Sequence, residues 1–265
     1  MLVIKALGLV YTSLVTFLYF FQEKLIFFPQ PPSYELRSQL AKNEVIFQHE
    51  GISLHGWYRG GEKEGNQDLL IIYFGGNAEE VSYSFFELSQ KFSHAVLAVN
   101  YRGFGSSEGK PSEAAILQDA NFIVKDIMRR KGFAPEKIIL LGRSLGAAVA
   151  TFVASNYAVR GSILVTPFDS LTHLAQGKYP MFPVSLLLKH RFPAKEWAQK
   201  IKSPCLLITG GQDKVVPNSY SINLAEKWQG GAEHYVIEAA SHNNISNFPD
   251  YWKEIENYLA KISVD

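Results

Sequence analysis

Three polar residues have types and positions suited to acyl transfer: Ser144, Asp213 and His242. Ser144 lies in the run Gly142-Arg143-Ser144-Leu145-Gly146, which is a Gly-x-Ser-x-Gly pattern. A serine hydroxyl is a weak nucleophile at neutral pH, so it needs a general base within hydrogen-bond reach and an acid that holds the base in one tautomer. The order serine, acid, histidine along the chain makes Asp213 the candidate acid and His242 the candidate base.

The residues around Ser144 predict a strand, a sharp turn and a helix. Residues 138–141 are four consecutive apolar residues, and small residues follow Gly146. The two glycines would let neighbouring backbone approach closely while the serine hydroxyl projects from the turn. The five-residue pattern alone is common by chance, and a serine in an ordinary tight turn would match it equally well, so the catalytic interpretation depends on its partners.

The candidate partners each follow an apolar run. Asp213 comes after residues 205–209 in a glycine-led loop, and His242 comes shortly after residues 235–237. Asp213 could instead be an ordinary turn or cap residue, and His242 a surface-loop histidine. Asp169 is the rival candidate for the acid.

An oxyanion formed at the substrate carbonyl requires two preset backbone donors. The amide of Leu145 is one candidate, because it follows the nucleophile at a helix N-terminus. The amide of Asn77 is the second, because Gly75 and Gly76 would let their loop fold back toward Ser144. The alternative is that these residues form only a tight turn.

The elements that must position these residues alternate between strand and helix, which predicts an α/β fold with a mostly parallel central sheet and helices on both faces. An antiparallel pair over residues 44–48 and 52–58 comes first, followed by a polar turn at 60–67. A helix with Glu79 and Glu80 at its start and a helix capped by Ser112 are also expected. Further helices are expected at 219–228 and 249–261. The predicted strands are 69–74, 95–99, 138–141, 162–165, 205–209 and 235–237.

A proline-rich insertion at residues 167–204 interrupts this alternation. It contains the apolar patch Val184-Ser185-Leu186-Leu187-Leu188. Because it follows a strand, we expect it above the carboxyl ends of the sheet, as a short lid or substrate wall.

The N-terminus contains a long apolar segment. Residues 2–21 contain one charge, Lys5, and are long enough to cross about 30 Å of hydrocarbon. A membrane anchor, a cleaved signal peptide and a buried helix all fit this composition, and the absence of a small-x-small cleavage pattern weakens the second. We expect an anchor and apolar stub at 1–28, a tether at 29–43 and one catalytic domain at 44–265. The flanking cations leave open which side of the membrane this domain faces.

Composition excludes several classes of function. The chain has 26 basic and 25 acidic residues, so it lacks the clustered positive charge of a nucleic-acid-binding protein. Its single cysteine, Cys205, lies in an apolar run and fits a buried, inert thiol. Neither metal-ligand spacing nor a phosphate-binding glycine loop is present, so we expect no cofactor and no metal. The oligomeric state stays open.

Taken together, the motifs resemble the α/β-hydrolase superfamily, and within it the membrane-anchored single-domain serine hydrolases, which include depalmitoylating thioesterases. The blocks that carry the resemblance are Tyr73-Phe74-Gly75-Gly76-Asn77-Ala78, Asn100-Tyr101-Arg102-Gly103-Phe104-Gly105-Ser106-Ser107-Glu108-Gly109, Gly142-Arg143-Ser144-Leu145-Gly146, Gly211-Gln212-Asp213 and Ser241-His242-Asn243. The resemblance spans about residues 44–259 and implies an α/β-hydrolase fold with serine hydrolysis of esters or thioesters.

This chain departs from the family pattern in the first oxyanion loop and at the residue before the histidine. Gly75-Gly76 stands where the family usually has His-Gly, and Glu79-Glu80 stands where it has small residues. Ser241 also replaces a common glycine. None of these changes removes a reacting group. We therefore expect a membrane-tethered hydrolase of small or lipid-like acyl esters or thioesters, with a serine peptidase and a non-catalytic binding protein as the alternatives.

Overall fold

A computed structural model describes residues 2–61 and 69–263 of the chain. Eight strands form a single sheet in the order β1-β2-β4-β3-β5-β6-β7-β8. β1 and β2 pair antiparallel, β2 pairs antiparallel with β4, and every later pair is parallel. The strands are β1 (Glu44–His49), β2 (Ile52–Arg59), β3 (Leu70–Phe74), β4 (Ala95–Val99), β5 (Ile138–Arg143), β6 (Gly161–Val165), β7 (Cys205–Gly210) and β8 (Ala232–Ile237).

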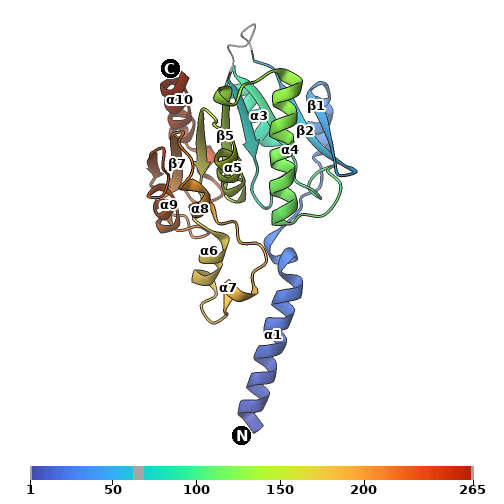
Figure 1. Cartoon of the computed structure of the whole chain (residues 1–265), viewed down its shortest axis with the longest axis vertical. Coiled ribbons are helices and arrows are strands. Elements are labelled where there is room, and N and C mark those ends of the chain that lie inside the picture. Colours follow the sequence, from blue (N-terminus) through green and yellow to red (C-terminus); the bar gives the residue numbers. More distant parts are fainter. Residues whose placement is uncertain (1, 62–68, 264–265) are drawn as a thin grey trace.

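Helices cover both faces of the sheet, as the alternating pattern predicts (Figure 1). The five-residue strands β3, β4 and β6 are buried throughout, because helices pack on both of their faces. The longer helices are α1 (Leu2–Ile26), α3 (Ser82–Lys91), α4 (Glu113–Lys131), α5 (Leu145–Asn156), α6 (Leu171–Lys178), α9 (Asn218–Ala225) and α10 (Pro249–Ser263). The shorter ones are α2 (Tyr34–Gln39), α7 (Val184–Leu187), α8 (Ala194–Ala198) and the 3-10 turns η1 (Ala41–Asn43), η2 (Pro135–Lys137) and η3 (Ile245–Asn247).

Two apolar cores result. One face of the sheet packs against α4, α5, α8 and α9, and the other packs against α3 and α10. The Ser112 hydroxyl accepts a hydrogen bond from the Ala115 amide at 3.2 Å and caps α4 as predicted, and Gly132 ends that helix at φ 74°. The helix expected to begin at Glu79 begins instead at Ser82. The polar turn expected at 60–67 lies almost entirely outside the described residues.

The insertion between β6 and β7 has two parts. α6 and α7 extend beyond the sheet, on the same side of the molecule as α1 (Figure 1). α8 instead returns to the body of the protein, where Ala194 and Ala198 are fully buried in the core against α5. Only α6, α7 and the segment between them can therefore act as a lid.

α1 leaves the rest of the fold and points away from it, with the N-terminus at its far end (Figure 1). It is long and apolar enough to cross a membrane, with a mean hydropathy of 1.7 over Val3–Ile26. Most of its large apolar side chains are exposed. A signal sequence near the N-terminus would meet the same criteria of length and composition.

Candidate active site

Ser144 occupies the turn between β5 and α5. Its backbone has φ 52° and ψ −112°, a strained conformation for a residue with a side chain. The flanking glycines are required by packing, since a Cβ on Gly142 would lie 2.2 Å from the Gly146 carbonyl oxygen. A Cβ on Gly146 would lie 2.0 Å from the carbonyl oxygen of Phe74. The two glycines of the pattern therefore follow from the close approach of α5 to its own strand β5 at Gly142 and to the neighbouring strand β3 at Gly146.

The three predicted residues meet at the carboxyl ends of β5, β7 and β8. Nε2 of His242 lies 3.1 Å from Oγ of Ser144, and Nδ1 of His242 lies 2.7 Å from Oδ2 of Asp213. Because an ionised carboxylate can only accept, Nδ1 carries the hydrogen and Nε2 is left to accept from the serine hydroxyl. Asp213 and His242 are both buried. The structure therefore brings together the three residues that the sequence predicts as nucleophile, base and orienting acid.

The Asp213 carboxylate is held by its own loop. Oδ1 accepts hydrogen bonds from the amides of Val215 and Val216, both at 2.8 Å, which leaves Oδ2 for the histidine. The rival acid Asp169 is engaged elsewhere, because its Oδ2 lies 2.7 Å from Nδ1 of His173. The geometry therefore pairs His242 with Asp213.

Three hydrogen bonds fix the loop after β3: one within the loop, one from the loop after β4 and one to the end of α1. The Gly75 carbonyl oxygen accepts from the Tyr101 hydroxyl at 2.9 Å, and the Gly76 amide donates to Oε2 of Glu79 at 2.8 Å. Asn77 is bound to the end of α1, where its Nδ2 donates to the Ile26 carbonyl oxygen at 2.9 Å. The Gly76 amide therefore already has a hydrogen-bond acceptor. Within the described residues the Asn77 amide has no hydrogen-bond acceptor, so it is free to meet an oxyanion.

The Leu145 amide is the first donor of α5. An amide at this position has no acceptor within its own helix. Leu145, Asn77, Ser144 and His242 all line one cavity. The two residues that are expected to supply the oxyanion donors therefore line the same space as Ser144.

The sequence does not predict the contacts that two further residues, Glu79 and Arg143, make at the site. Glu79 accepts from the Tyr73 hydroxyl at 2.7 Å, from the Ser84 hydroxyl at 2.6 Å and from the Gly76 amide. Arg143, at a variable position of the serine motif, donates to the His242 carbonyl oxygen at 3.2 Å and lies 3.8 Å from the Glu79 carboxylate. The signal for Glu79 was present in the sequence, since an acidic residue replaces a small one in the family pattern.

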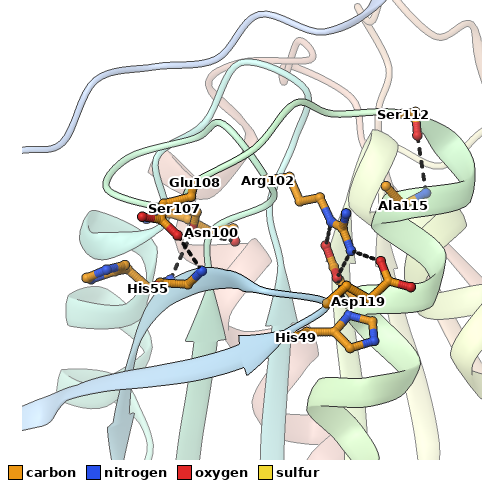
Figure 2. A network of polar contacts seen from close by, with 11 residues as sticks. His49, His55, Asn100, Arg102, Ser107, Glu108, Ser112, Ala115 and Asp119 are labelled. Carbon is orange, nitrogen blue, oxygen red and sulfur yellow. Dashed lines mark hydrogen bonds and ion pairs between the residues drawn. The ribbon is translucent and has the colours of Figure 1, made fainter.

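A polar network supports the loop after β4 from the side of β1 and β2 (Figure 2). The Ser107 hydroxyl accepts from the His55 amide at 2.9 Å and donates to the Asn100 carbonyl oxygen at 3.0 Å. Figure 2 also shows Arg102 bound to the carboxylate of Asp119, with His49 on the same carboxylate at 2.6 Å. The loop that carries Tyr101, and through it the Gly75 carbonyl, is therefore anchored at both ends.

The space above Ser144 is a cavity of about 900 Å³ with mainly apolar walls. This volume is in the upper range for a small-molecule site. Side chains from α1, from the insertion helices α6 and α7, and from the loops that carry Asn77, Ser144 and His242 line it. Among the described residues, no cluster of three or more histidine, cysteine or acidic side chains is placed to hold a metal ion.

Comparison with known proteins identifies the family of the chain. Residues 54–200, which are more than half of the chain, match the Alpha/beta hydrolase family. The chain belongs to the alpha/beta hydrolase family. The eight-stranded, mostly parallel sheet with a serine turn after β5 is the fold expected of such a hydrolase.

Relatives of this alpha/beta hydrolase occur in bacteria and in vertebrates. The uncharacterized protein Rv2307c of Mycobacterium tuberculosis is 29% identical over 91% of this chain and 88% of its own length. Alpha/beta hydrolase domain-containing protein 17B of Xenopus laevis is 28% identical over 72% of this chain and 66% of its own length.

Solved structures show the same fold. The esterase Pf2001 of Pyrococcus furiosus superposes with a TM-score of 0.70 at 21% identity, over 89% of this chain and 99% of its own. Est1E of Butyrivibrio proteoclasticus, determined with ferulic acid bound, superposes with a TM-score of 0.66 at 15% identity, over 83% of this chain and all of its own.

Proposed function

We propose that this alpha/beta hydrolase cleaves carboxylic ester or thioester bonds through a Ser144-His242-Asp213 triad and an acyl-enzyme intermediate. The observation that carries the proposal is the hydrogen-bonded chain from Oγ of Ser144 through the imidazole of His242 to the buried carboxylate of Asp213. A chain of this kind activates a serine that is otherwise a weak nucleophile.

In this mechanism Ser144 attacks the acyl carbonyl as Nε2 of His242 takes the hydroxyl proton. The oxyanion is received by the amides of Leu145 and Asn77, and it collapses as His242 returns the proton to the leaving alcohol or thiol. Water then attacks the acyl-serine with His242 as base, which releases the carboxylic acid and restores the hydroxyl. Asp213 keeps Nδ1 protonated throughout and stabilises the imidazolium.

The walls of the cavity support an acyl or lipid-like substrate. Apart from a few polar groups at the catalytic end, the lining side chains from α1, α6 and α7 are mostly aliphatic or aromatic. Such walls favour a hydrocarbon chain over a sugar or a charged peptide. The structural likeness to Pf2001, which is named an esterase, is in keeping with ester hydrolysis.

We also propose that α1 anchors the enzyme in a membrane. Its length, its apolar composition and the exposure of its side chains support this role. Mass spectrometry of the mature protein distinguishes an anchor from a cleaved signal, because an anchor keeps residues 2–26 and a signal sequence loses them. Loss of this segment would refute the anchor.

The decisive test of substrate class is a panel of p-nitrophenyl esters and matched acyl-thioesters of graded chain length, assayed with the full chain in detergent. We expect hydrolysis that favours longer acyl chains and disappears in Ser144→Ala. A preference for acetyl over every longer chain would contradict the acyl-chain proposal. Cleavage of peptide amides in preference to all esters would identify a peptidase instead.

A further inference from the structure

The anchor helix forms part of the active-site cavity. Leu14, Leu18, Gln22 and Leu25 of α1 line the same space as Ser144. We propose that α1 is one wall of the acyl site, and that the acyl chain of a bilayer lipid ester lies between α1 and the lid helices α6 and α7. This inference rests on the proposed ester hydrolysis and identifies its substrate as one drawn sideways from the membrane.

The residues of α1 that line the cavity form a single stripe. Leu14, Leu18, Gln22 and Leu25 are spaced by four, four and three residues, which places them on one face of a helix. Leu9 lies half a turn away from Leu18 around the helix axis, and its side chain is 71% exposed. An apolar helix that served only as a tether would have no reason to present one face to a catalytic cavity.

Polar contacts fix this face of α1 against the lid near the catalytic end. Gln22 is buried at 6% exposure, and both the nitrogen and the oxygen of its side-chain amide make hydrogen bonds to the lid segment. Nε2 donates to the Leu187 carbonyl oxygen at 3.2 Å, and Oε1 accepts from the Lys189 amide at 2.7 Å. A buried amide that pairs with two backbone groups of another segment sets the orientation of α1 about its axis.

A second contact lies farther along the helix, toward the N-terminus. The Tyr11 hydroxyl donates to the Met181 carbonyl oxygen at 3.0 Å, and its ring stacks on Phe182 with centroids 5.8 Å apart. Tyr11 and Gln22 are eleven residues apart, which corresponds to about 16 Å of helix. The lid therefore follows α1 over about the thickness of one membrane leaflet, which is roughly half of the 30 Å hydrocarbon layer.

The outer surface of the lid is apolar where it would meet lipid. Met181 is 72% exposed and Leu186 is 80% exposed, and Tyr179 beside them is also exposed. Exposed apolar side chains that continue the surface of a membrane-length helix match the hydrocarbon of a leaflet. Lys178, the one charged lid residue at the cavity, is exposed and long enough to extend toward headgroups. In a membrane, hydrocarbon would thus lie next to the cavity that α1 and the lid both line, and an acyl chain could enter from there without crossing water.

The proposal is tested by substituting a larger side chain on the face of α1 that lines the cavity. Leu18→Trp places a larger side chain in the acyl site, whereas Leu9→Trp makes the same exchange on the opposite face of α1. Both variants are compared with the wild type, as the full chain in phosphatidylcholine vesicles, on p-nitrophenyl butyrate and p-nitrophenyl palmitate. We expect the palmitate-to-butyrate rate ratio to fall about tenfold in Leu18→Trp and to stay near the wild-type ratio in Leu9→Trp.

The outcomes separate the two proposals. An unchanged ratio in Leu18→Trp, or equal changes in both variants, would overturn the role of α1 while leaving ester hydrolysis intact. A wild-type enzyme that hydrolyses neither these esters nor the matched acyl-thioesters would instead refute the proposed function.

A cross-link provides a measurement that does not depend on turnover. Cys205 is buried, and burial raises the pKa of its thiol, so engineered cysteines react in preference to it. Tyr11→Cys combined with Phe182→Cys should cross-link with a short bis-maleimide in vesicles, and Leu9→Cys combined with Phe182→Cys should not. Absence of the first cross-link, or equal yields for both pairs, would overturn the contact between α1 and the lid.

Discussion

The Asn77 side chain donates a hydrogen bond of 2.9 Å to the main-chain carbonyl of Ile26, the last residue of α1. The Asn77 carbonyl oxygen in turn accepts from the Phe28 amide at 2.9 Å. A carbonyl at a helix C-terminus has no intrahelical partner. The loop after β3 supplies that partner at the end of α1, and the residue that follows α1 by two positions donates back to the loop. The proposed oxyanion donor is therefore positioned by the same helix that we propose to be the membrane anchor.

Removing the Asn77 side chain should impair catalysis more than binding. Asn77→Ala keeps the backbone amide but loses the bond to Ile26, so we expect kcat to fall about tenfold while KM changes little. Asn43→Ala is the matched control, because Asn43 makes an equivalent bond to the Tyr58 carbonyl away from the site. Steady-state kinetics of both variants measure the difference. Equal losses in the two variants would contradict a positioning role for Asn77.

The acid is tested by an isosteric exchange. Asp213→Asn should lower kcat by about ten-thousand-fold, because an amide no longer holds His242 in the required tautomer. Asp169→Asn makes the same exchange at the carboxylate that pairs with His173 and should cost far less. The rates are measured on one p-nitrophenyl ester. A larger loss in Asp169→Asn would assign the acid to Asp169.

The close approach of α5 to β3 predicts a sharp effect on stability. Gly146→Ala would place Cβ 2.0 Å from the Phe74 carbonyl oxygen. We expect it to lower the free energy of unfolding by about 3 kcal/mol or more, because backbone atoms must move. Gly60→Ala, where the nearest atom is 3.9 Å away, should have little effect. Denaturant unfolding of the two variants provides the comparison, and similar stabilities would contradict the packing argument.

His190 should make stability sensitive to acid. Burial lowers the pKa of His190, and its Nδ1 accepts from the Glu113 amide at 3.2 Å. Because the pKa of His190 in the folded state lies below its unfolded value of about 6.5, the unfolded chain binds the proton more readily. The stability that the neutral imidazole contributes to the folded state is therefore present above about pH 6.5 and is lost as pH falls. His190→Gln should therefore show a smaller drop in Tm between about pH 7.5 and about pH 5. Equal drops for wild type and variant would contradict this assignment.

The three candidate catalytic residues could be predicted because the position of each depends on local order along the chain. A serine between two glycines after an apolar run, and an acid and a histidine that each follow a later run, place Ser144, Asp213 and His242 at strand ends through topology alone. The strands could also be predicted from local sequence, because buried parallel strands appear as continuous apolar runs.

The supporting contacts could not be predicted, because they join segments far apart in sequence. The sequence predicts Glu79 at the start of a helix, whereas in the structure its carboxylate accepts from the Gly76 amide that precedes it. The role of Gln22 depends on the lid backbone more than 160 residues away. The return of α8 to the core likewise follows from its packing on α5, which periodicity over five residues does not reveal.

Labelling with a fluorophosphonate probe tests the central claim most directly. The probe reacts only with a serine that a general base activates, and peptide mapping identifies the residue modified. We predict a single labelled site at Ser144, abolished in Ser144→Ala and retained in Ser155→Ala, whose hydroxyl bonds to its own helix α5. Equal labelling of the wild type and Ser144→Ala would contradict the account.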